Sequence, residues 1–233
     1  MHIFYCPDIS ENPFLSEKES RHATKVLRLK NGEKINLIDG NGGFYTVKII
    51  DENSKKCKVK ILEKRRNYGK RNYYLHIAIA PTKNISRFEW FLEKATEIGI
   101  DEITPIICQH SERKTLKTER LEKILISAMK QSQQAFLPRL NPIVSFNELI
   151  NKSVNQQKLI AICAGEGKSQ HLKNLYKKEN DAVICIGAEG GFSKDEIEAS
   201  VDKGYAPVSL GSNRLRTETA GFTACHAISL INQ

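Results

Sequence analysis

The chain has 233 residues, which is enough for one large domain or two small ones with a sizeable core. Lys and Arg number 36 against 27 Asp and Glu, and this formal charge of +9 favours an anionic partner, nucleic acid ahead of an acidic membrane surface. The start of the chain lacks the pattern of a signal peptide, and no apolar run approaches the length of a membrane span. The sequence therefore predicts a soluble, cytoplasmic protein with no membrane segment.

Cysteine and histidine spacing gives no sign of a metal site. The six cysteines lie far apart, mostly in apolar stretches, and neither they nor the six histidines have zinc-ligand spacing. We expect buried, reduced thiols that pack as small hydrophobic groups, and no bound metal.

The first seventy residues predict a small β-rich domain. Ser16 and Glu19 have capping-box spacing, which predicts a helix over 16–31, ended by Asn31-Gly32. Alternating apolar and polar residues over 35–37, 45–49 and 57–61 predict strands, the first two joined as a hairpin. A β-barrel is the simplest arrangement of these elements.

A basic segment follows the predicted barrel and marks a domain boundary. Residues 64–72 contain one glycine, no acid and five basic residues: Lys64, Arg65, Arg66, Lys70 and Arg71. We expect these side chains to contact phosphates, and a solvated linker is the alternative.

From residue 73 onwards, strands alternate with helices. The apolar pattern predicts strands at 74–80, 103–108, 159–163, 182–186 and 208–210, and helices at 85–98, 118–136 and 219–231. This alternation predicts a largely parallel sheet with helices on both faces. The last helix is apolar nearly all round, which predicts burial on every side, one side being covered by a second subunit.

Two glycine-containing turns follow predicted strands near the end of the chain. The first contains Gly187, Gly190 and Gly191 and leads into a helix that Ser193 and Glu196 cap; the second contains Gly211. Strand-to-helix loops at the carboxyl edge of a parallel sheet are where small ligands bind, although a plain tight turn is the alternative. The dinucleotide fingerprint is absent, and Glu189 disfavours a polyphosphate, so a neutral or cationic ligand fits better.

A third glycine turn imitates a phosphate-binding loop. The strand at 159–163 leads into Ala164-Gly165-Glu166-Gly167-Lys168-Ser169. The P-loop motif needs its first glycine at position 162, which is Ile162. A P-loop nucleotide hydrolase is therefore rejected, and the turn remains as a third ligand loop beside the other two.

These three turns resemble the cofactor site of the SPOUT methyltransferases. The chain is similar along its whole length to the bacterial 16S rRNA (uridine-N3) methyltransferase family. The motifs that carry the resemblance are Ile186-Gly187-Ala188-Glu189-Gly190-Gly191-Phe192-Ser193, Leu210-Gly211, Leu215-Arg216-Thr217-Glu218-Thr219-Ala220, Lys94-Ala95-Thr96-Glu97-Ile98-Gly99, Gln131-Ser132, His22 with Val26-Leu27-Arg28, and Asp39-Gly40-Asn41-Gly42. The family usually has Pro at Ala188, Glu at Lys130, Arg at Gln134 and Arg at His110.

The resemblance implies a PUA-like RNA-binding β-barrel over 1–70 and a SPOUT-type α/β domain over 73–233, with a parallel sheet and a trefoil knot. It also implies a homodimer, S-adenosylmethionine as cofactor, and 16S rRNA or the small ribosomal subunit as partner. The implied cofactor residues are Cys163, Ala164, Gly165, Ile186, Gly187, Glu189, Gly190, Gly191, Leu210, Gly211, Leu215 and Thr219. The expected RNA contacts are Arg28, Arg87 and the basic residues Lys64, Arg65, Arg66, Lys70 and Arg71.

The expected chemistry assigns roles to Arg216 and Glu218. Methylation at uridine N3 requires loss of the N3 proton, so a base or a group that stabilises the uridine anion is needed. Arg216 is the candidate for orienting the uracil or stabilising its negative oxygen. Glu218 is either the base or a structural partner of Arg216. A non-catalytic ribosome-assembly factor and a SPOUT enzyme for another RNA nucleotide are the competing functions.

Overall fold

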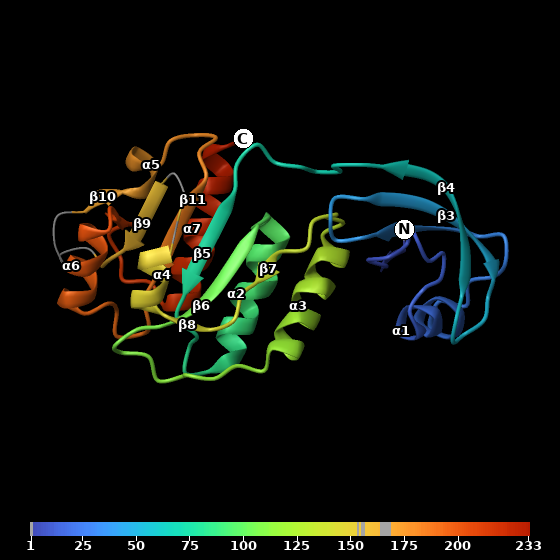
Figure 1. Ribbon diagram of the computed structural model, residues 1–233, viewed down its shortest axis with the longest axis horizontal. Helices are drawn as coiled ribbons and strands as arrows, with labels where there is room; N and C mark the ends of the chain where they lie inside the picture. The colour runs from blue at the N-terminus through green and yellow to red at the C-terminus, as the bar shows by residue number, and fades with distance from the viewer. Residues whose placement is uncertain (1, 153, 155–156, 164–168) are drawn as a thin grey trace. The chain divides into compact units, whose positions relative to one another are not determined.

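A computed structural model of the chain describes residues 2–152, 154, 157–163 and 169–233. The chain divides into two compact units (Figure 1). Unit 1 is Met1–Lys70 with Ile126–Leu137, and unit 2 is Arg71–Leu125 with Pro138–Gln233. Unit 1 thus includes a segment from the middle of the chain, which the predicted range 1–70 leaves out.

Unit 1 is built on a four-stranded sheet in the order β1-β2-β3-β4. Its strands are β1 (Ile3–Tyr5), β2 (Lys34–Ile38), β3 (Phe44–Asp51) and β4 (Lys58–Arg65), and every pair except β1 with β2 is antiparallel. Phe14 forms a bridge to Lys58 on β4, and the thiol of Cys6 donates a hydrogen bond to the Phe14 carbonyl at 3.4 Å. The chain after β1 therefore returns to the far edge of the sheet, which curls as a small barrel does.

The first helix is shorter than its sequence pattern predicts. The helix α1 (Glu17–Arg21) passes into a π-helical turn, η1 (His22–Val26), and Arg28 then adopts a φ of 57°. The chain leaves the helix at this point because Leu27 and Leu29 pack against the core. Only half of the predicted capping box forms: Ser16 accepts from the Glu19 N–H, whereas the Glu19 carboxylate pairs with Lys130 Nζ at 2.6 Å.

The helix α3 (Thr118–Gln131) begins in unit 2, ends in unit 1, and stops five residues before its predicted end at 136. Gln133 adopts a φ of 59°, and the chain then extends to pair with the β2–β3 turn. The Gly42 N–H donates to the Ala135 carbonyl at 2.8 Å, and Asn41 and Phe136 form a bridge. Pairing with the turn replaces the last turns of the helix.

Unit 2 contains a parallel sheet in the order β10-β12-β9-β11-β5-β6-β7, with β8 also paired to β6. Its strands are β5 (Leu75–Ile79), β6 (Glu102–Ile107), β7 (Arg139–Leu140), β8 (Val144–Ser145), β9 (Gln157–Ala161), β10 (Gln170–His171), β11 (Ala182–Ile186) and β12 (Ala206–Ser209). All of these pairings are parallel, as the alternation of strands and helices predicts.

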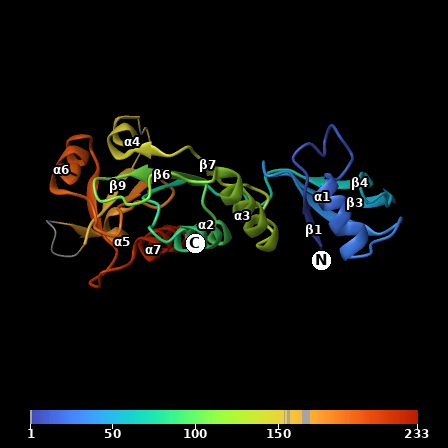
Figure 2. The ribbon, with the colours of Figure 1, turned by 90° about the horizontal axis from the view of Figure 1, so that it is seen from below.

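Helices cover both faces of this sheet (Figure 2). The helices α4 (Phe146–Lys152) and α6 (Lys194–Asp202) lie on one face, and α2 (Ile85–Ile98), α5 (Leu172–Leu175) and α7 (Thr217–Ile231) lie on the other. The box predicted at Ser193 and Glu196 forms in full, and Gly99 ends α2 with a φ of 109°. Both helix boundaries are therefore confirmed.

In the single chain the last helix has one buried face and one open face, and the cover of the open face by a second subunit stays a prediction. One face of α7 packs on α2 and β5, where a Cβ at Gly221 would lie 2.8 Å from Ile79 and Phe91. On the other face, His226 is exposed and Leu230 is 59% exposed. An apolar composition all round thus accompanies one buried face and one open face.

The cysteines of the described residues are free thiols, and all but Cys163 are buried. Burial raises the pKa of Cys6 and Cys57 to about 11 and that of Cys108 to about 12, so these thiols stay protonated at neutral pH. Within the described residues, no helix is both long and apolar enough to span a bilayer, and no cluster of His, Cys, Asp or Glu has the makings of a metal site.

Candidate functional site

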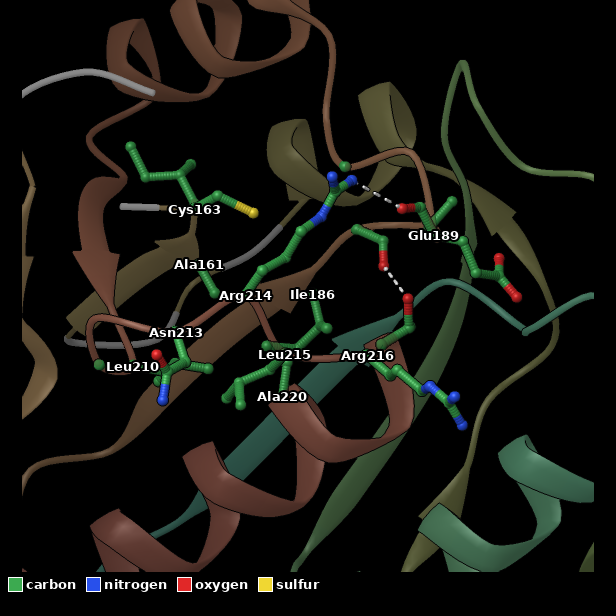
Figure 3. Close-up of a pocket in the computed structure, with 16 residues that line it drawn as sticks. Ala161, Cys163, Ile186, Glu189, Leu210, Asn213, Arg214, Leu215, Arg216 and Ala220 are labelled. Atoms are coloured by element: carbon green, nitrogen blue, oxygen red, sulfur yellow. Dashed lines mark hydrogen bonds between the residues drawn. The ribbon is translucent and has the colours of Figure 1, made fainter. Parts of the chain in front are cut away.

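A cavity of about 290 Å³ lies where three neighbouring strands end (Figure 3). The strands β12, β9 and β11 are adjacent and parallel, so their carboxyl ends meet at one edge of the sheet. The loops after these strands, together with the start of α7, form the walls. This is the edge at which parallel α/β sheets bind ligands.

Most of the predicted cofactor residues lie on this cavity. Those that line it are Cys163, Ile186, Gly187, Glu189, Gly191, Leu210, Gly211 and Leu215. Gly190 and Thr219 are not among the lining residues, and Ala164 and Gly165 lie outside the described residues. The other lining residues are Ala161, Ile162, Ala188, Asn213, Arg214, Arg216, Thr217 and Ala220.

The loop after β11 presents its backbone to the cavity. The Gly191 N–H donates to the Ala188 carbonyl at 2.8 Å, and Gly191 adopts a φ of 76°, which favours glycine. A Cβ at Gly187 would lie 3.0 Å from the Gly191 carbonyl carbon, so a side chain there would crowd the turn. The Thr217 hydroxyl donates to the Gly187 carbonyl at 3.2 Å and fixes the start of α7 on this loop.

Glu189 lines the cavity with its main chain, and its carboxylate points elsewhere. Its Oε1 accepts a hydrogen bond from the Lys83 N–H at 2.9 Å, and the side chain is directed away from the cavity (Figure 3). Its carbonyl accepts from Arg214 Nη2 at 3.4 Å. Glu189 therefore connects the loops that follow β5, β11 and β12, and its own carboxylate is directed away from the cavity.

Arg113 adds the loop after β6 to this network. Its guanidinium donates to the Thr82 carbonyl at 3.0 Å and to the Lys83 carbonyl at 2.7 Å. His110 Nδ1 lies 3.2 Å from the Gly191 carbonyl, and a Cβ at Gly190 would lie 2.9 Å from the His110 Cβ. Glycine at 190 is thus required by the close approach of two loops.

Arg216 and Glu218 do not pair with each other, which corrects the hypothesis of an Arg216–Glu218 pair. Arg216 is exposed, lines the cavity and precedes α7, and its guanidinium extends away from Leu215 and Ala220 (Figure 3). Glu218 lies in the first turn of the helix, and residues two apart on a helix face different directions. Glu218 Oε1 instead lies 3.8 Å from Arg87 Nε.

Glu218 is almost fully buried and lies outside the cavity lining. The residue is 7% exposed, and no group of the described residues donates a hydrogen bond to its buried Oε2. Arg216, in contrast, makes no ion pair with any carboxylate that the structure describes. The cation is thus available at the cavity, while the carboxylate is buried beside Arg87.

Some of the predicted RNA-binding cations make hydrogen bonds or ion pairs within the protein, and others are simply exposed to solvent. Lys64 Nζ donates to Ser10 Oγ at 3.0 Å, and Arg65 pairs with Glu63 at 2.7 Å. Arg71 pairs with Asp101 at 2.6 Å and donates to the Gly99 carbonyl. Arg28, Arg66 and Lys70 are exposed. The interactions of Arg71 stabilise unit 2 and leave its guanidinium little capacity for a phosphate.

Sequence reasoning missed several lining residues, of which Arg214 and Thr217 matter most. Both lie within the predicted loop between Gly211 and the last helix, so their position in the chain was a usable signal. The link from Lys83 to Glu189 joins residues 106 positions apart, and no local pattern indicates it.

Comparison with known proteins defines the class of this fold and site. Residues 70–229 match the RNA methyltransferase domain family, and residues 15–62 match the RNA methyltransferase PUA domain. The chain therefore belongs to the RNA methyltransferase family in which these two domains occur.

Its relatives narrow the class further. The chain is 30% identical over 226 residues to the ribosomal RNA small subunit methyltransferase E of Aquifex aeolicus, covering 94% of this chain and 95% of that protein. The crystal structure of a probable rRNA-methyltransferase from Porphyromonas gingivalis is similar with a TM-score of 0.94, 39% identity, and 100% and 98% of the two chains covered. The structure of the ribosomal RNA small subunit methyltransferase E from Neisseria gonorrhoeae, bound to S-adenosylmethionine, has a TM-score of 0.88, 27% identity, and coverage of 100% and 98%.

Proposed function

We propose that the protein uses S-adenosylmethionine to methylate N3 of a uridine in 16S rRNA. The observation that carries this proposal is the cavity at the ends of β9, β11 and β12, walled by glycine-bearing loops. Membership of the RNA methyltransferase family supports the reaction, and the names of the relatives support the small-subunit rRNA as substrate. Uridine N3 as the target atom and the trefoil knot rest on the sequence motifs.

The residues of the cavity fit S-adenosylmethionine. Ala161, Ile186, Leu210, Leu215 and Ala220 give apolar walls suited to an adenine ring, and the volume of about 290 Å³ is close to that of small-ligand pockets. The Glu189 carboxylate is turned outward, so the loop at 187–191 offers backbone groups to the ligand. These loops, with Cys163 and Gly211, would hold the cofactor.

The bound cofactor supplies a methyl group on a sulfonium. The residues of this chain position the reactants and exclude water, which together account for much of the rate of such a displacement. Arg216 is exposed at the cavity and stabilises the negative oxygen that forms on the uracil when its N3 proton leaves. Glu218 lies outside the cavity lining and next to Arg87, which favours a structural role over that of a base.

We also propose that the protein is a homodimer through the open face of α7. Trp90 is 41% exposed and its ring lies 5.4 Å from that of Phe222, which in turn lies 6.2 Å from the ring of His226. With Leu230, these side chains form an exposed aromatic and apolar surface of the kind that marks an interface. Light scattering should give roughly twice 26.4 kDa, and Phe222→Asp should give the monomer mass.

Two measurements test the proposed function. Calorimetry with the purified protein should detect binding of S-adenosylmethionine or its demethylated product, and no appreciable binding of ATP. Nucleoside mass spectrometry of 16S rRNA should show N3-methyluridine in cells with the gene and its loss in cells without it. Binding of the cofactor without any change in rRNA methylation would instead favour a non-catalytic assembly factor.

A further inference from the structure

The outer face of the sheet in unit 1 changes character from one end to the other. The inner face carries Ile35 and Leu37 on β2, Val47 and Ile49 on β3, and Val59 on β4, all of them in the core. Because side chains alternate along a strand, the residues between them form the outer face. The register of the strands arranges this outer face in rows across the sheet.

Two of these rows are satisfied within unit 1. In the first row, Ile38 is opposite Phe44, and both are covered by Met129 and Ala135 of the segment 126–137. In the second row, Asn36 is opposite Thr46, whose hydroxyl lies 3.4 Å from the Asn36 side-chain oxygen.

The third row consists of lysines only. Lys34 is opposite Lys48, and Lys48 is opposite Lys60, so three ammonium groups are carried side by side on β2, β3 and β4. All three residues are exposed. We call these residues the lysine row. Adjacent strands are about 4.8 Å apart, and like charges directly opposite each other destabilise a sheet.

Nothing in the described part of unit 1 compensates this repulsion. None of the three ammonium groups lies within ion-pair distance of a carboxylate in the described chain. The nearby acids have other partners: Glu33 accepts from the Lys30 N–H at 2.5 Å, and Glu52 accepts from the Asn31 N–H at 2.8 Å. At the far end of β4, by contrast, Arg65 forms an ion pair with Glu63.

We infer that the lysine row is a surface on which unit 1 binds the phosphate backbone of RNA. This inference rests on the proposed function, and it identifies the surface of the substrate-binding unit. Lysine is a strongly hydrated point charge on a flexible stem, which suits phosphates at variable positions and reads no base sequence. Arg65 and Arg71 of the predicted basic segment are occupied by internal ion pairs, whereas the lysine row has no carboxylate partner within the described part of the chain.

Other anionic partners fit this surface less well. Membrane-binding basic clusters contain about four to eight Lys or Arg, and this row has three. Protein interfaces are depleted in lysine and rely on buried aromatic or Arg anchors, and the row itself consists of lysines alone. The match to the RNA methyltransferase PUA domain covers residues 15–62 and therefore includes all three lysines.

The test is a charge-neutral triple variant, Lys34→Gln with Lys48→Gln and Lys60→Gln. Binding to a 16S rRNA fragment is measured by fluorescence anisotropy across a range of salt concentrations. Each lost phosphate contact lowers the slope of log affinity against log salt by about 0.7–0.9, so the slope should fall by about 2–3 and affinity at low salt by at least about tenfold. Its melting temperature should equal or exceed that of the wild type, because repulsion is relieved.

The matched control removes three exposed lysines of unit 2, Lys123, Lys178 and Lys203, and changes the net charge equally. Its slope should stay close to that of the wild type. An equal fall in both variants would overturn the inference, since net charge alone would explain it. An unchanged slope in the first variant, or loss of binding to phosphatidylserine vesicles with RNA affinity intact, would overturn it as well.

Cofactor binding separates this inference from the proposed function. The triple variant should bind S-adenosylmethionine as the wild type does, because the cavity lies in unit 2. If the wild type binds RNA through the lysine row and binds no S-adenosylmethionine, the proposed function fails and the inferred surface stands.

Discussion

Charged residues at the carboxyl edge of the large sheet and on the outer face of the small sheet are used in opposite ways. At the edge in unit 2, Glu189 and Arg113 bind backbone groups of neighbouring loops and hold the walls of a cavity. On the sheet of unit 1, the lysine row has no carboxylate partner among the described residues. The hydrogen bonds of Glu189 and Arg113 fix the shape of a cavity for a small ligand. The unpaired ammonium groups of the lysine row are left available for a long anionic chain such as RNA.

The largest effect is expected from Arg216, which lines the cavity and makes no ion pair with a carboxylate of the described residues. Arg216→Ala should lower methyl transfer to rRNA by a hundredfold or more, roughly the 2.7–4 kcal/mol attached to one lost oxyanion donor. Affinity for S-adenosylmethionine and the melting temperature should change little, because Arg216 is exposed. Single-turnover methylation and calorimetry measure the two quantities.

Arg214→Ala is the matched control, because Arg214 donates to the Glu189 carbonyl and holds the loop. It should weaken cofactor binding. If Arg216→Ala loses cofactor affinity and melting temperature together, Arg216 braces the loop and has no catalytic role.

Arg71, which is paired with Asp101, should affect stability where Arg216 affects activity. Arg71→Ala leaves Asp101 without its partner at 2.6 Å, in a position where both side chains are about one-fifth exposed. Burial already raises the pKa of Asp101, and the Arg71 guanidinium opposes that rise. The variant should lose about 2–3 kcal/mol of unfolding free energy in urea, since the burial is partial. Lys70→Ala, at an exposed position, should stay within about 0.5 kcal/mol of the wild type.

The next largest effect is a pH dependence of the unfolding free energy that comes from His76, a buried histidine in unit 2. Burial lowers the pKa of His76, whose Nε2 lies 2.7 Å from the Thr104 hydroxyl. On acidification, His76 of the unfolded chain takes up a proton at about pH 6.5, whereas buried His76 of the folded chain stays neutral to lower pH. The free energy of unfolding therefore falls as the pH drops below about 6.5. Urea unfolding at pH 7.5 and 5.5 should differ by about 1 kcal/mol from this group.

His76→Gln should flatten this part of the pH profile, and His2→Gln, at an exposed position, should not. Glu102 sits beside His76; burial raises the pKa of Glu102, but His76 and hydrogen bonds from Asn141 and Tyr74 lower it on balance. Its contribution is lost only at lower pH, as the pH falls through the folded-state pKa. An unchanged profile in His76→Gln would show that other groups set the pH dependence.

The smallest expected effect is a gain in stability, whereas the Arg71 variant loses stability. Lys48→Gln removes the central charge of the lysine row, and stability at low salt should rise by about 0.2–1 kcal/mol. The gain should shrink as salt screens the repulsion. Lys123→Gln, exposed on α3, serves as the control and should show no gain. A loss of stability in Lys48→Gln would mean that the row is not repulsive.

The sequence predicted elements where the signal is local and missed features that depend on distant partners. Apolar runs located β9, β11 and β12 within a few residues, and the box at Ser193 and Glu196 marked the start of α6. The predicted ends of the first helix and of α3 were too late, because core packing and the pairing of Phe136 with Asn41 override helix propensity. The lysine row depends on strand register, which a single strand does not reveal.

The site shows the same limit. The glycine motifs indicated which loops surround the cavity, but they gave only part of its lining, because Arg214 and Thr217 line it and were not predicted as cofactor residues. The direction of the Glu189 carboxylate depends on Lys83, and the partner of Glu218 proved to be Arg87 on α2. A motif fixes the conformation of its own backbone, whereas the orientation of its charged side chains is set by residues far away in the chain.

The inclusion of residues 126–137 in unit 1 has a consequence for synthesis on the ribosome. The strands of the small sheet are complete at residue 65, and Tyr68 packs on Phe44, but the cluster around Ile38 and Phe44 also needs Met129 and Ala135. At about 5–20 residues per second, the nascent chain waits roughly 3–14 s between these two points. During that interval the part of the cluster that Met129 and Ala135 later cover faces the solvent. It is then a site for a chaperone or for misassembly between neighbouring chains on one polysome. Slow codons between the two points would lengthen this exposure.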